Sequence, residues 1–523
     1  MISGAMLLVA GFFYLLANSF SYSDADLGWH LRIGQDILSA AKAPVINQYN
    51  YTLAELTWVD HEWLLNGLMA GIFNKTGFLG LHLFFVLVAL VAFLLAWWRS
   101  LFLGGWALLT GSLAAILCGF GIFASRFHLG IRVQAVGLFG VALILYILPF
   151  LSKKRYWLWL LPLFFAVWAN LHGSFLLGLG LLGAYFFYAL LAPWWQKWHW
   201  TNYFAKSNFS RVDKFNLGFI FVFSLVATLI NPYGLGLSSI LGGYTNTFYM
   251  SWINEWQSQF VLPLVYSQLF YLVLPVIGLL IFYYQGGFKK RTLSLWDFIC
   301  LVVLFILAFK SRRHFPIFVV MSVPVLTFIF QEEVASLWRK LSSRVYWVKW
   351  LLLVIFFVIM SSFIFMKIMT MPWRQDSINA FCDKHYPCQA VAYLQNRPET
   401  LSWHLWNEYN WGGFLLWRYP TKQLFIDGRM PQAAYRGRTI LEEYVDFRKK
   451  DTDLSFLLDQ YQIRLVLISN QRPPLQIKEW EKLVLGVSEQ GGWSPDYLRE
   501  YLDTSPDWQV VFKDKLSTIY EKN

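Results

Sequence analysis

The chain has 523 residues, of which 57% are hydrophobic and 19% aromatic, while only 14% are charged. Soluble globular domains are about half apolar and about a quarter charged, so this composition excludes an ordinary soluble protein. The formal net charge of +12 is spread over many loops instead of forming one tract, which argues against a nucleic-acid patch. We therefore expect a mainly α polytopic membrane protein without a nucleic-acid partner.

Apolar runs long enough to cross about 30 Å of hydrocarbon recur along the first 371 residues. They cover residues 2–20, 79–98, 101–124, 131–151, 156–170, 173–193, 215–231, 263–285, 294–310, 314–331 and 349–369. The pattern predicts about eleven transmembrane helices in a domain of residues 1–371, with a large first outer loop at 21–78. The first run lacks a basic start and a small-residue cleavage site, so we expect a retained helix and not a removed signal peptide.

Lysine and arginine near membrane ends are held on the cytoplasmic side, so their positions predict the orientation. With a cytoplasmic N-terminus, the cytoplasmic loops carry Arg99, Lys153, Lys154, Arg155, Lys197, Lys206, Arg211, Lys214, Lys289, Lys290, Arg291, Arg339, Lys340, Arg344 and Lys349. An odd number of crossings then places everything after residue 371 outside the cytoplasm.

Residues 372–523 differ in composition from the rest, because short strand and helix patterns alternate there and no membrane-length run follows. We expect an extracytoplasmic α/β domain. It is predicted to contain buried strands at 423–426 and 464–468, amphipathic helices at 441–449 and 454–461, and a hairpin at 509–520.

Two cysteines of this domain, Cys382 and Cys388, would lie in an oxidising compartment and could close a small loop as a disulfide. Two free thiols are the alternative. A zinc site is disfavoured, because zinc needs four ligands and shorter cysteine spacings.

The first outer loop carries the acidic residues with the greatest catalytic interest. Asp24 and Asp26 directly follow the first apolar run, so their carboxylates should lie at the bilayer boundary, in a short extended segment. A partly desolvated carboxylate can act as a general base on an acceptor hydroxyl. A second cluster, Asp60-His61-Glu62, precedes a helix that begins at Trp63. Asp60 is equally suited to cap that helix, and Glu62 to stabilise its first turn.

Basic side chains are expected on the same face of the membrane as these acids. They are Arg126, Arg132, His172, Lys310, Arg312, Arg313 and His314. Phosphate binding requires such cations, and arginine can grip a phosphate bidentately. The alternative for Arg312 and Arg313 is that they reach lipid headgroups, although basic clusters outside run against the positive-inside trend.

Two features of the C-terminal domain allow more than one interpretation. Asp427-Gly428-Arg429 follows a predicted strand, where α/β sheets often bind ligands, but a tight turn explains it equally well. Several aromatic residues could stack on sugars, but we expect them to form the contact with the membrane domain. They are Trp403, Trp406, Tyr409, Trp411 and Trp417.

Several segments together resemble a bacterial group of GT-C type integral membrane glycosyltransferases, which includes mannosyltransferase-like enzymes. The first reads Asp24-Ala25-Asp26-Leu27-Gly28-Trp29-His30-Leu31-Arg32-Ile33-Gly34, and the second Trp58-Val59-Asp60-His61-Glu62-Trp63. The others are residues 126–134, 168–173, 231–234, 255–256, 312–315, 409–419 and 425–429. The resemblance spans nearly the whole chain.

This resemblance implies an enzyme of the bacterial inner membrane that moves a sugar from a polyprenyl-phosphate carrier to an extracytoplasmic glycan, lipid or protein acceptor, with inversion. Asp24 or Asp26 would be the catalytic carboxylate, with Asp26 preferred because Leu27, Gly28 and Trp29 give it a drier setting. Asp60, His61 and Glu62 would form a second cluster that orients the acceptor, the base or an optional divalent ion. Oligosaccharyltransferase-type relatives use a divalent metal, whereas monosaccharide-carrier enzymes generally do not, so no metal or other cofactor is expected.

Other classes remain open at this point. A transporter or flippase of lipid-linked glycans is also polytopic, but transporters bind near the midplane and often contain repeated halves, and neither feature is evident here. A polysaccharide polymerase or ligase would use a diphosphate-linked glycan. A non-catalytic assembly subunit would have lost its acids, whereas Asp24 and Asp26 are retained.

Overall fold

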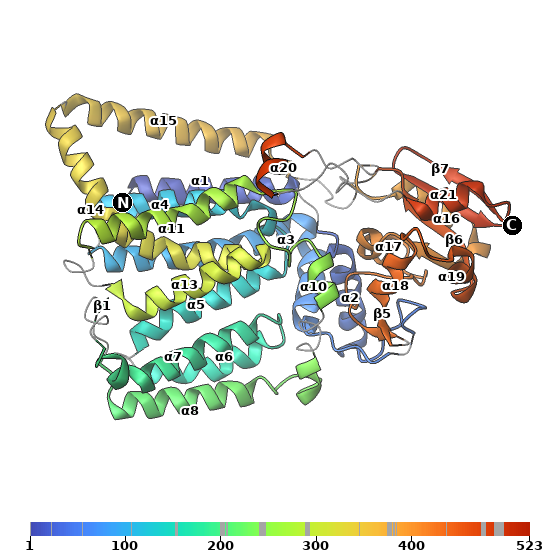
Figure 1. Ribbon diagram of the computed structural model, residues 1–523, viewed down its shortest axis with the longest axis horizontal. Coiled ribbons are helices and arrows are strands. Elements are labelled where there is room, and N and C mark those ends of the chain that lie inside the picture. Colours follow the sequence, from blue (N-terminus) through green and yellow to red (C-terminus); the bar gives the residue numbers. More distant parts are fainter. Residues whose placement is uncertain are drawn as a thin grey trace.

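The computed structural model describes the whole chain except residues 1, 22–23, 55, 106, 152–154, 199–203, 206–207, 240–246, 288–292, 345, 374–378, 380–381, 383, 436, 472–476 and 486–495. The molecule is elongated, with a bundle of apolar helices at one end and a C-terminal part, residues 372–523, at the other (Figure 1). The N-terminus lies in the bundle and the C-terminus at the far tip of the C-terminal part (Figure 1).

The helices of the bundle run roughly along the long axis of the molecule (Figure 1). They are α1 Ile2–Ser21, α3 Trp63–Leu103, α4 Leu108–Ala124, α5 Gln134–Leu151, α6 Leu161–Trp168, α7 Phe175–Trp195, α8 Arg211–Ala227, α11 Tyr266–Tyr284, α13 Leu295–Lys310, α14 Phe315–Arg344 and α15 Tyr346–Thr370. Short elements join them: η1 Arg126–His128, η2 Arg155–Leu160, η4 Gly234–Ser239, α10 Thr247–Trp252 and η5 Arg312–His314, with a parallel pair β1 Phe204–Ala205 and β2 Leu293–Ser294.

Four helices in the described part of the chain are long and apolar enough to cross a membrane: Trp63–Leu103, Phe175–Trp195, Tyr266–Tyr284 and Arg312–Lys340. Five further apolar helices are shorter: Met6–Ser21, Leu108–Ala124, Gln134–Pro149, Tyr156–Trp168 and Phe357–Thr370. The protein is therefore a helical membrane protein, although the described helices do not establish the expected eleven crossings. One reason is local, because the run at 156–170 is split between a 3₁₀ turn and the eight residues of α6.

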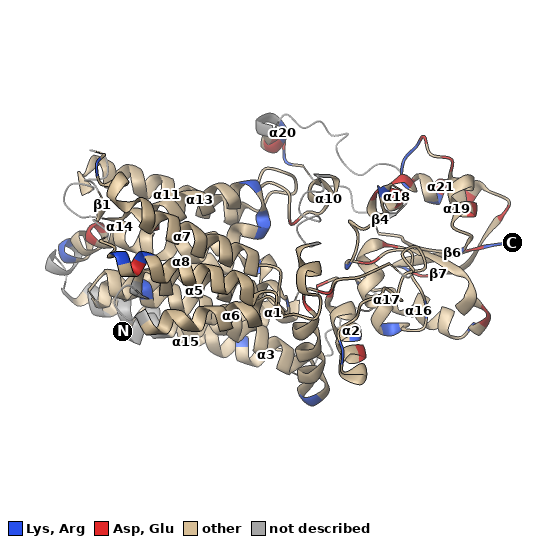
Figure 2. Cartoon of the chain, turned by 90° about the horizontal axis from the view of Figure 1, so that it is seen from below, with Lys and Arg blue, Asp and Glu red and all other residues tan. Residues whose placement is uncertain are grey.

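Lysine and arginine side chains gather at the two ends of the bundle, and its middle is nearly free of charge (Figure 2). One internal ion pair joins Arg99 near the end of α3 to Asp297 in the first turn of α13, with 3.4 Å between nitrogen and oxygen. Both side chains are buried, so each charge is compensated by the other.

The first loop is largely helical, whereas the sequence predicted a helix there only from Trp63 onward. Helix α2, Leu27–Ala40, follows Asp26 directly, and α3 begins at Trp63 as expected. Gly77 interrupts α3 with φ of 62°, a conformation that glycine adopts readily, so the helix bends between the loop and the membrane run that follows. The expected extended segment at Asp24–Asp26 is wrong, because Leu27 N–H donates to Asp24 O at 3.2 Å and Asp26 has helical angles.

The C-terminal part is built around a four-stranded sheet in the order β3-β6-β8-β7. Its strands are β3 His404–Asn407, β6 Ile463–Ser469, β7 Trp508–Lys513 and β8 Ser517–Lys522, and a small pair is formed by β4 Ala434–Tyr435 and β5 Arg438–Thr439. The other elements are α16 Cys388–Gln395, η7 Pro398–Ser402, η8 Tyr409–Trp411, α17 Gly412–Arg418, α18 Ile440–Asp446, α19 Leu454–Gln460, α20 Glu479–Leu485 and α21 Tyr497–Thr504. Strand β6, helices α18 and α19 and the final hairpin lie where the sequence predicted them.

The expected strand at 423–426 is replaced by a single residue that continues the sheet. Leu424 forms isolated bridges to Leu405 of β3 and to Asn50 of the first loop. Leu424 N–H donates to Tyr49 O at 3.0 Å, and Tyr51 N–H donates to Leu424 O at 3.2 Å. The first loop therefore covers the edge of this sheet, which fixes it against the C-terminal part.

Two glycines, Gly28 of α2 and Gly413 of α17, allow the backbones of these helices to come into direct contact. A Cβ on Gly28 would lie 2.2 Å from Gly413 O, and a Cβ on Gly413 would lie 2.2 Å from Ala25 O. No side chain fits in either place. The segment that carries Asp24 and Asp26 is thus held directly against the C-terminal part (Figure 1).

Candidate active site

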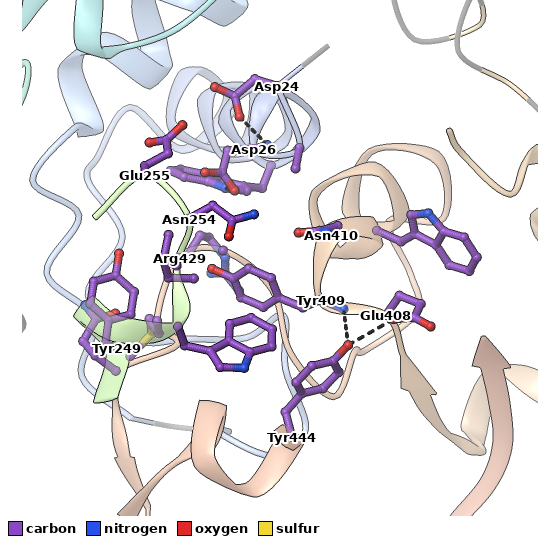
Figure 3. A pocket seen from close by; sticks show the side chains of 18 of the residues that line it. Asp24, Asp26, Tyr249, Asn254, Glu255, Glu408, Tyr409, Asn410, Arg429 and Tyr444 are labelled. Atoms are coloured by element: carbon purple, nitrogen blue, oxygen red, sulfur yellow. Dashed lines mark hydrogen bonds between the residues drawn. The ribbon is translucent and has the colours of Figure 1, made fainter. Parts of the chain in front are cut away.

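A cavity of about 1640 Å³ lies where the helical bundle, the first loop and the C-terminal part meet. Seven of the residues selected from the sequence line it: Asp24, Asp26, Asp60, His61, Glu62, Arg132 and Arg313. The remaining wall comes from α10 and from loops of the C-terminal part (Figure 3). Its volume exceeds the 300–1,000 Å³ common for small-ligand pockets, which leaves room for two substrates.

Asp26 is the carboxylate in the most unusual setting. Trp29 Nε1–H donates to its Oδ1 at 2.8 Å, and its own backbone N–H donates to Asp24 Oδ1 at 3.1 Å. Burial and the neighbouring charge of Asp24 raise the pKa of Asp26 to about 8. A carboxylate with such a pKa is a much stronger base than an ordinary aspartate.

Arg132 lies between two acids at the rim of the same cavity. Its Nε is 3.2 Å from Asp24 Oδ2, and its Nη1 donates to Glu255 Oε1. Burial would raise the pKa of Glu255, but Arg132 and Arg313 lower it to about 2. Glu255 therefore stays charged and holds Arg132 in place. From the sequence, Glu255 was expected on the same outer face as Arg132 and in a resembling segment, but no local pattern predicts that the two side chains pair.

The carboxylates of Asp24, Asp26 and Glu255 are not arranged as ligands of a divalent metal. In the described part of the chain, no group of three His, Cys, Asp or Glu side chains is arranged to hold one. Asp24 and Glu255 already share the guanidinium of Arg132, which supplies the positive charge that a cation would bring. We therefore derive no step through a metal.

Three histidines surround the carboxylate of Glu62. His61 Nε2 and His172 Nε2 lie 3.4 and 3.5 Å from its Oε1, and His30 Nδ1 lies 3.9 Å from its Oε2. Burial alone would raise the pKa of Glu62, but His61 and His172 hold it well below its usual range. Ser174 N–H donates to His172 Nδ1 at 3.1 Å, so the ring proton of His172 is on the nitrogen that faces Glu62.

Glu62 is therefore held by three histidines where it lines the cavity. His172 was expected to bind phosphate, but the structure places it behind Glu62 and outside the cavity lining. Of the histidines around Glu62, His30 and His61 line the cavity, and a third of the His61 side chain is exposed.

Asp60 stabilises the turn before α3 and does not cap the helix itself. Its Oδ1 accepts from Glu62 N–H at 3.1 Å, and its Oδ2 accepts from Asn66 Nδ2 at 2.9 Å. The residue at the cap position is Glu62, without a side-chain hydrogen bond to the helix. Burial raises the pKa of Asp60 to about 6.

Arg313, like Arg132, is an arginine of the expected phosphate-binding group that lines the cavity. It lies in η5, directly before α14; its backbone N–H donates to Glu255 O at 2.9 Å, and its guanidinium lies 4.8 Å from the ring centroid of Trp256. The backbone bond and the stacked ring fix where this cation points.

The other expected phosphate ligands lie outside the cavity lining. Arg126 donates to Phe123 O and Ser267 Oγ, both at 2.9 Å, and Arg312 donates to the carbonyls of Val261 and Pro263. Lys310 is exposed at the last turn of α13, and His314 packs edge-on against Trp256 with 5.9 Å between ring centroids. The sequence shows that these residues are basic, but not which groups their side chains contact; the partners of Arg312, for example, lie in the turn at 257–263.

The turn at Asp427-Gly428-Arg429 joins the C-terminal part to the first loop. Arg429 pairs with Asp427 at 2.6 Å and donates to Asn50 Oδ1 at 2.6 Å. Gly428 leaves room for Asp26, because a Cβ there would lie 2.0 Å from Asp26 Oδ1. Of the two interpretations of this motif, the structure shows a turn that also forms part of the cavity wall.

Cys382 and Cys388 are joined by a disulfide, with 5.3 Å between their Cα atoms. The loop that they close presents Tyr386, which lines the cavity and donates to Asp24 O at 3.2 Å. Tyr386 also stacks on Phe414 of α17 at 4.6 Å between centroids. The disulfide thus lies close to the segment that carries Asp24 and Asp26.

No protein-family model matches the chain, and no curated protein matches its sequence. Among solved structures, the apo form of the Archaeoglobus fulgidus oligosaccharyltransferase is similar, with a TM-score of 0.52, 10% sequence identity, and coverage of 89% of this chain and 69% of that one. The chain has the fold of an oligosaccharyltransferase. A structure of the same archaeal enzyme, tethered to an acceptor peptide containing the NVT sequon, gives a TM-score of 0.49 at 11% identity, with coverage of 89% and 68%.

That archaeal enzyme has a GT-C type fold, so the likeness supports the type of fold that the resembling segments imply. At this level of identity the comparison establishes the fold alone. The function has to be argued from the cavity and its side chains.

Proposed function

We propose that the chain is a GT-C type membrane glycosyltransferase of the bacterial inner membrane. It takes a sugar from a polyprenyl-phosphate carrier at the extracytoplasmic face and transfers it to an acceptor with inversion. The observation that carries this proposal is one cavity, at the end of an apolar bundle, that holds both a carboxylate with a raised pKa and a fixed arginine.

Asp26 is the general base in this mechanism. It removes the proton from an acceptor hydroxyl as the hydroxyl oxygen attacks the anomeric carbon, and the bond from that carbon to the phosphate oxygen breaks. The bonding electrons leave with the polyprenyl phosphate, and attack from the opposite face inverts the anomeric centre. Trp29 holds the carboxylate oriented, and Arg132 reduces the repulsion from Asp24.

Arg313 is the donor-phosphate contact. It precedes the membrane helix α14 and lines the cavity, so a phosphate on a membrane-embedded lipid chain can reach it without leaving the bilayer surface. Its guanidinium stabilises the negative charge that develops on the leaving phosphate. Arg132 is already paired with Asp24 and Glu255, so we assign it to the acids and not to the donor.

The location of the cavity favours a transferase over a transporter. Transporter sites lie near the middle of the membrane and alternate between its two faces. Here the acids and the arginine lie where the bundle meets the C-terminal part, and a direct backbone contact between α2 and α17 closes that junction.

The test is sugar transfer in proteoliposomes that contain the purified full chain and a radiolabelled lipid extract from cells that produce it. We expect Asp26→Asn to lower transfer by at least a hundredfold, while Asp507→Asn, at an exposed position far from the cavity, keeps the wild-type rate. Arg313→Ala should raise the donor KM more than the acceptor KM. Wild-type turnover by both Asp24→Asn and Asp26→Asn would contradict the mechanism.

A further inference from the structure

The wall of the cavity that faces Asp26 is aromatic. Trp252 of α10 contacts Tyr409 at 5.8 Å and Tyr444 at 6.0 Å between ring centroids, in both cases nearly perpendicular. Tyr249, one turn before Trp252, also lines the cavity. The rings of Trp252 and Tyr409 are only half-buried, so flat apolar faces remain available within the cavity. The expectation that Tyr409 serves only the contact with the membrane domain is therefore too narrow.

Neutral hydrogen-bonding groups accompany these rings. Asn254 and Asn410 are exposed and point toward one another, with the ring of Tyr409 beside them (Figure 3). Within the described residues, the side chains of these three form no hydrogen bond to another residue. Burial and the charge of Asp26 raise the pKa of Tyr409 well above its usual range, so its hydroxyl remains a donor close to the base.

The charged groups of this wall are already paired with one another. Arg448 donates to Glu408 Oε2 at 2.6 Å and lies 3.6 Å from Asp496, and Ser469 N–H donates to Glu408 Oε1 at 3.0 Å. Arg429 is likewise bound by Asp427. The wall consequently offers little net charge to a phosphate or to an acidic ligand.

We propose that Asn254, Tyr409 and Asn410 form a subsite for a sugar ring, so that the acceptor of the proposed transfer is a neutral glycan. Amides and a phenol match ring hydroxyls, and the faces of Trp252 and Tyr409 match the apolar face of a pyranose. One hydroxyl of the bound ring then points to Asp26. This inference rests on the proposed function and names its acceptor.

The other acceptor classes fit the wall less well. A lipid acceptor would need an apolar channel, whereas amides and a phenol occupy this surface. A peptide commonly binds by adding to a free strand edge. The edge of β3 is instead covered by Leu424 and by the first loop.

The experiment measures binding without any donor present. Saturation-transfer difference NMR is recorded on the full chain in nanodiscs with neutral trisaccharides that end in glucose, galactose, mannose or N-acetylglucosamine, and with hexapeptides containing Asn, Ser and Thr as the comparison. We expect saturation transfer to at least one trisaccharide and to no peptide. Each lost hydrogen bond should weaken binding by about fivefold, so Asn254→Ala/Asn410→Ala should weaken it by about 25-fold. Asn396→Ala, at an exposed position after α16, is the matched control and should bind as the wild type does.

Three results would overturn the subsite. These are no saturation transfer to any of the trisaccharides, trisaccharide binding that the double variant retains within twofold, or peptide binding that the double variant loses. Failure of the proposed function would look different. In that case trisaccharides bind and the double variant loses them, but no sugar is transferred from the lipid extract.

Discussion

Gly428→Ala tests whether the C-terminal part positions the catalytic carboxylate. The added Cβ would lie 2.0 Å from Asp26 Oδ1, whereas ordinary contacts begin near 3.4 Å. The carboxylate must therefore move by about 1.4 Å. A misplacement of about 1 Å can reduce a rate by about 10²-fold, so we expect kcat to fall about a hundredfold, or about 2.7 kcal/mol in the activation barrier.

The same substitution should leave the fold nearly unchanged. The atom that it meets is the end of a side chain, which can rotate away at the cost of its 2.8 Å hydrogen bond from Trp29. A change in unfolding free energy of about 1 kcal/mol or less follows. Gly412→Ala differs, because its Cβ would lie 2.7 Å from the Cα of Asp427 and would displace backbone.

The assay is sugar transfer in proteoliposomes, with thermal unfolding measured on the same preparations. Gly71→Ala is the matched control, since a Cβ there meets nothing within 4 Å. It should keep the wild-type kcat. A Gly428→Ala protein whose kcat stays within threefold of wild type would refute the argument that this glycine makes room for the base.

Three further predictions concern the base and the disulfide. A carbodiimide reacts with protonated carboxyl groups, so labelling of Asp26 should be strong below pH 8 and disappear as the pH rises through about 8. The rate of sugar transfer should increase over the same range. Labelling that does not change between pH 6 and 10 would contradict the raised pKa of Asp26. Trp29→Phe removes the hydrogen bond that favours the charged form of Asp26, so the midpoints of the labelling and transfer curves should both move to higher pH. Unmoved midpoints would show that this hydrogen bond does not affect the pKa of Asp26. Replacing Cys382 and Cys388 with serine opens a loop with a sequence separation of 6. The unfolding free energy, measured by denaturant titration, should fall by about 2 kcal/mol. Equal stability of the reduced and the oxidised wild-type protein would contradict this prediction.

Much of the architecture could be predicted because lipid and water impose strong patterns. Long apolar runs were expected to form helices, since a single membrane-length segment satisfies all its own backbone hydrogen bonds only as a helix. The alternating pattern near the C-terminus predicted β6 and the final hairpin. Helix α2 was missed because its first five residues, 27–31, are all buried, so the one-sided burial typical of a surface helix begins only after its first turn.

Residues of the site could be predicted only where their neighbours in the sequence mark them. Asp24 and Asp26 were selected because they follow an apolar run directly, and both line the cavity. The pairing of Arg132 with Glu255 spans 123 residues, and the contact of Gly428 with Asp26 spans some 400. Such contacts depend on how helices and loops pack, and no periodicity in one sequence reports them.

The central claim is that one cavity holds both the donor phosphate and the base. Its most direct test is an electron cryomicroscopy structure of Asp26→Asn in nanodiscs with polyprenyl phosphate. We predict phosphate density against Arg313, within the cavity that Asp26 lines, and an isoprenoid tail running from it along the bundle. A phosphate bound elsewhere with the cavity empty, or a lipid passing through the middle of the membrane, would contradict the account.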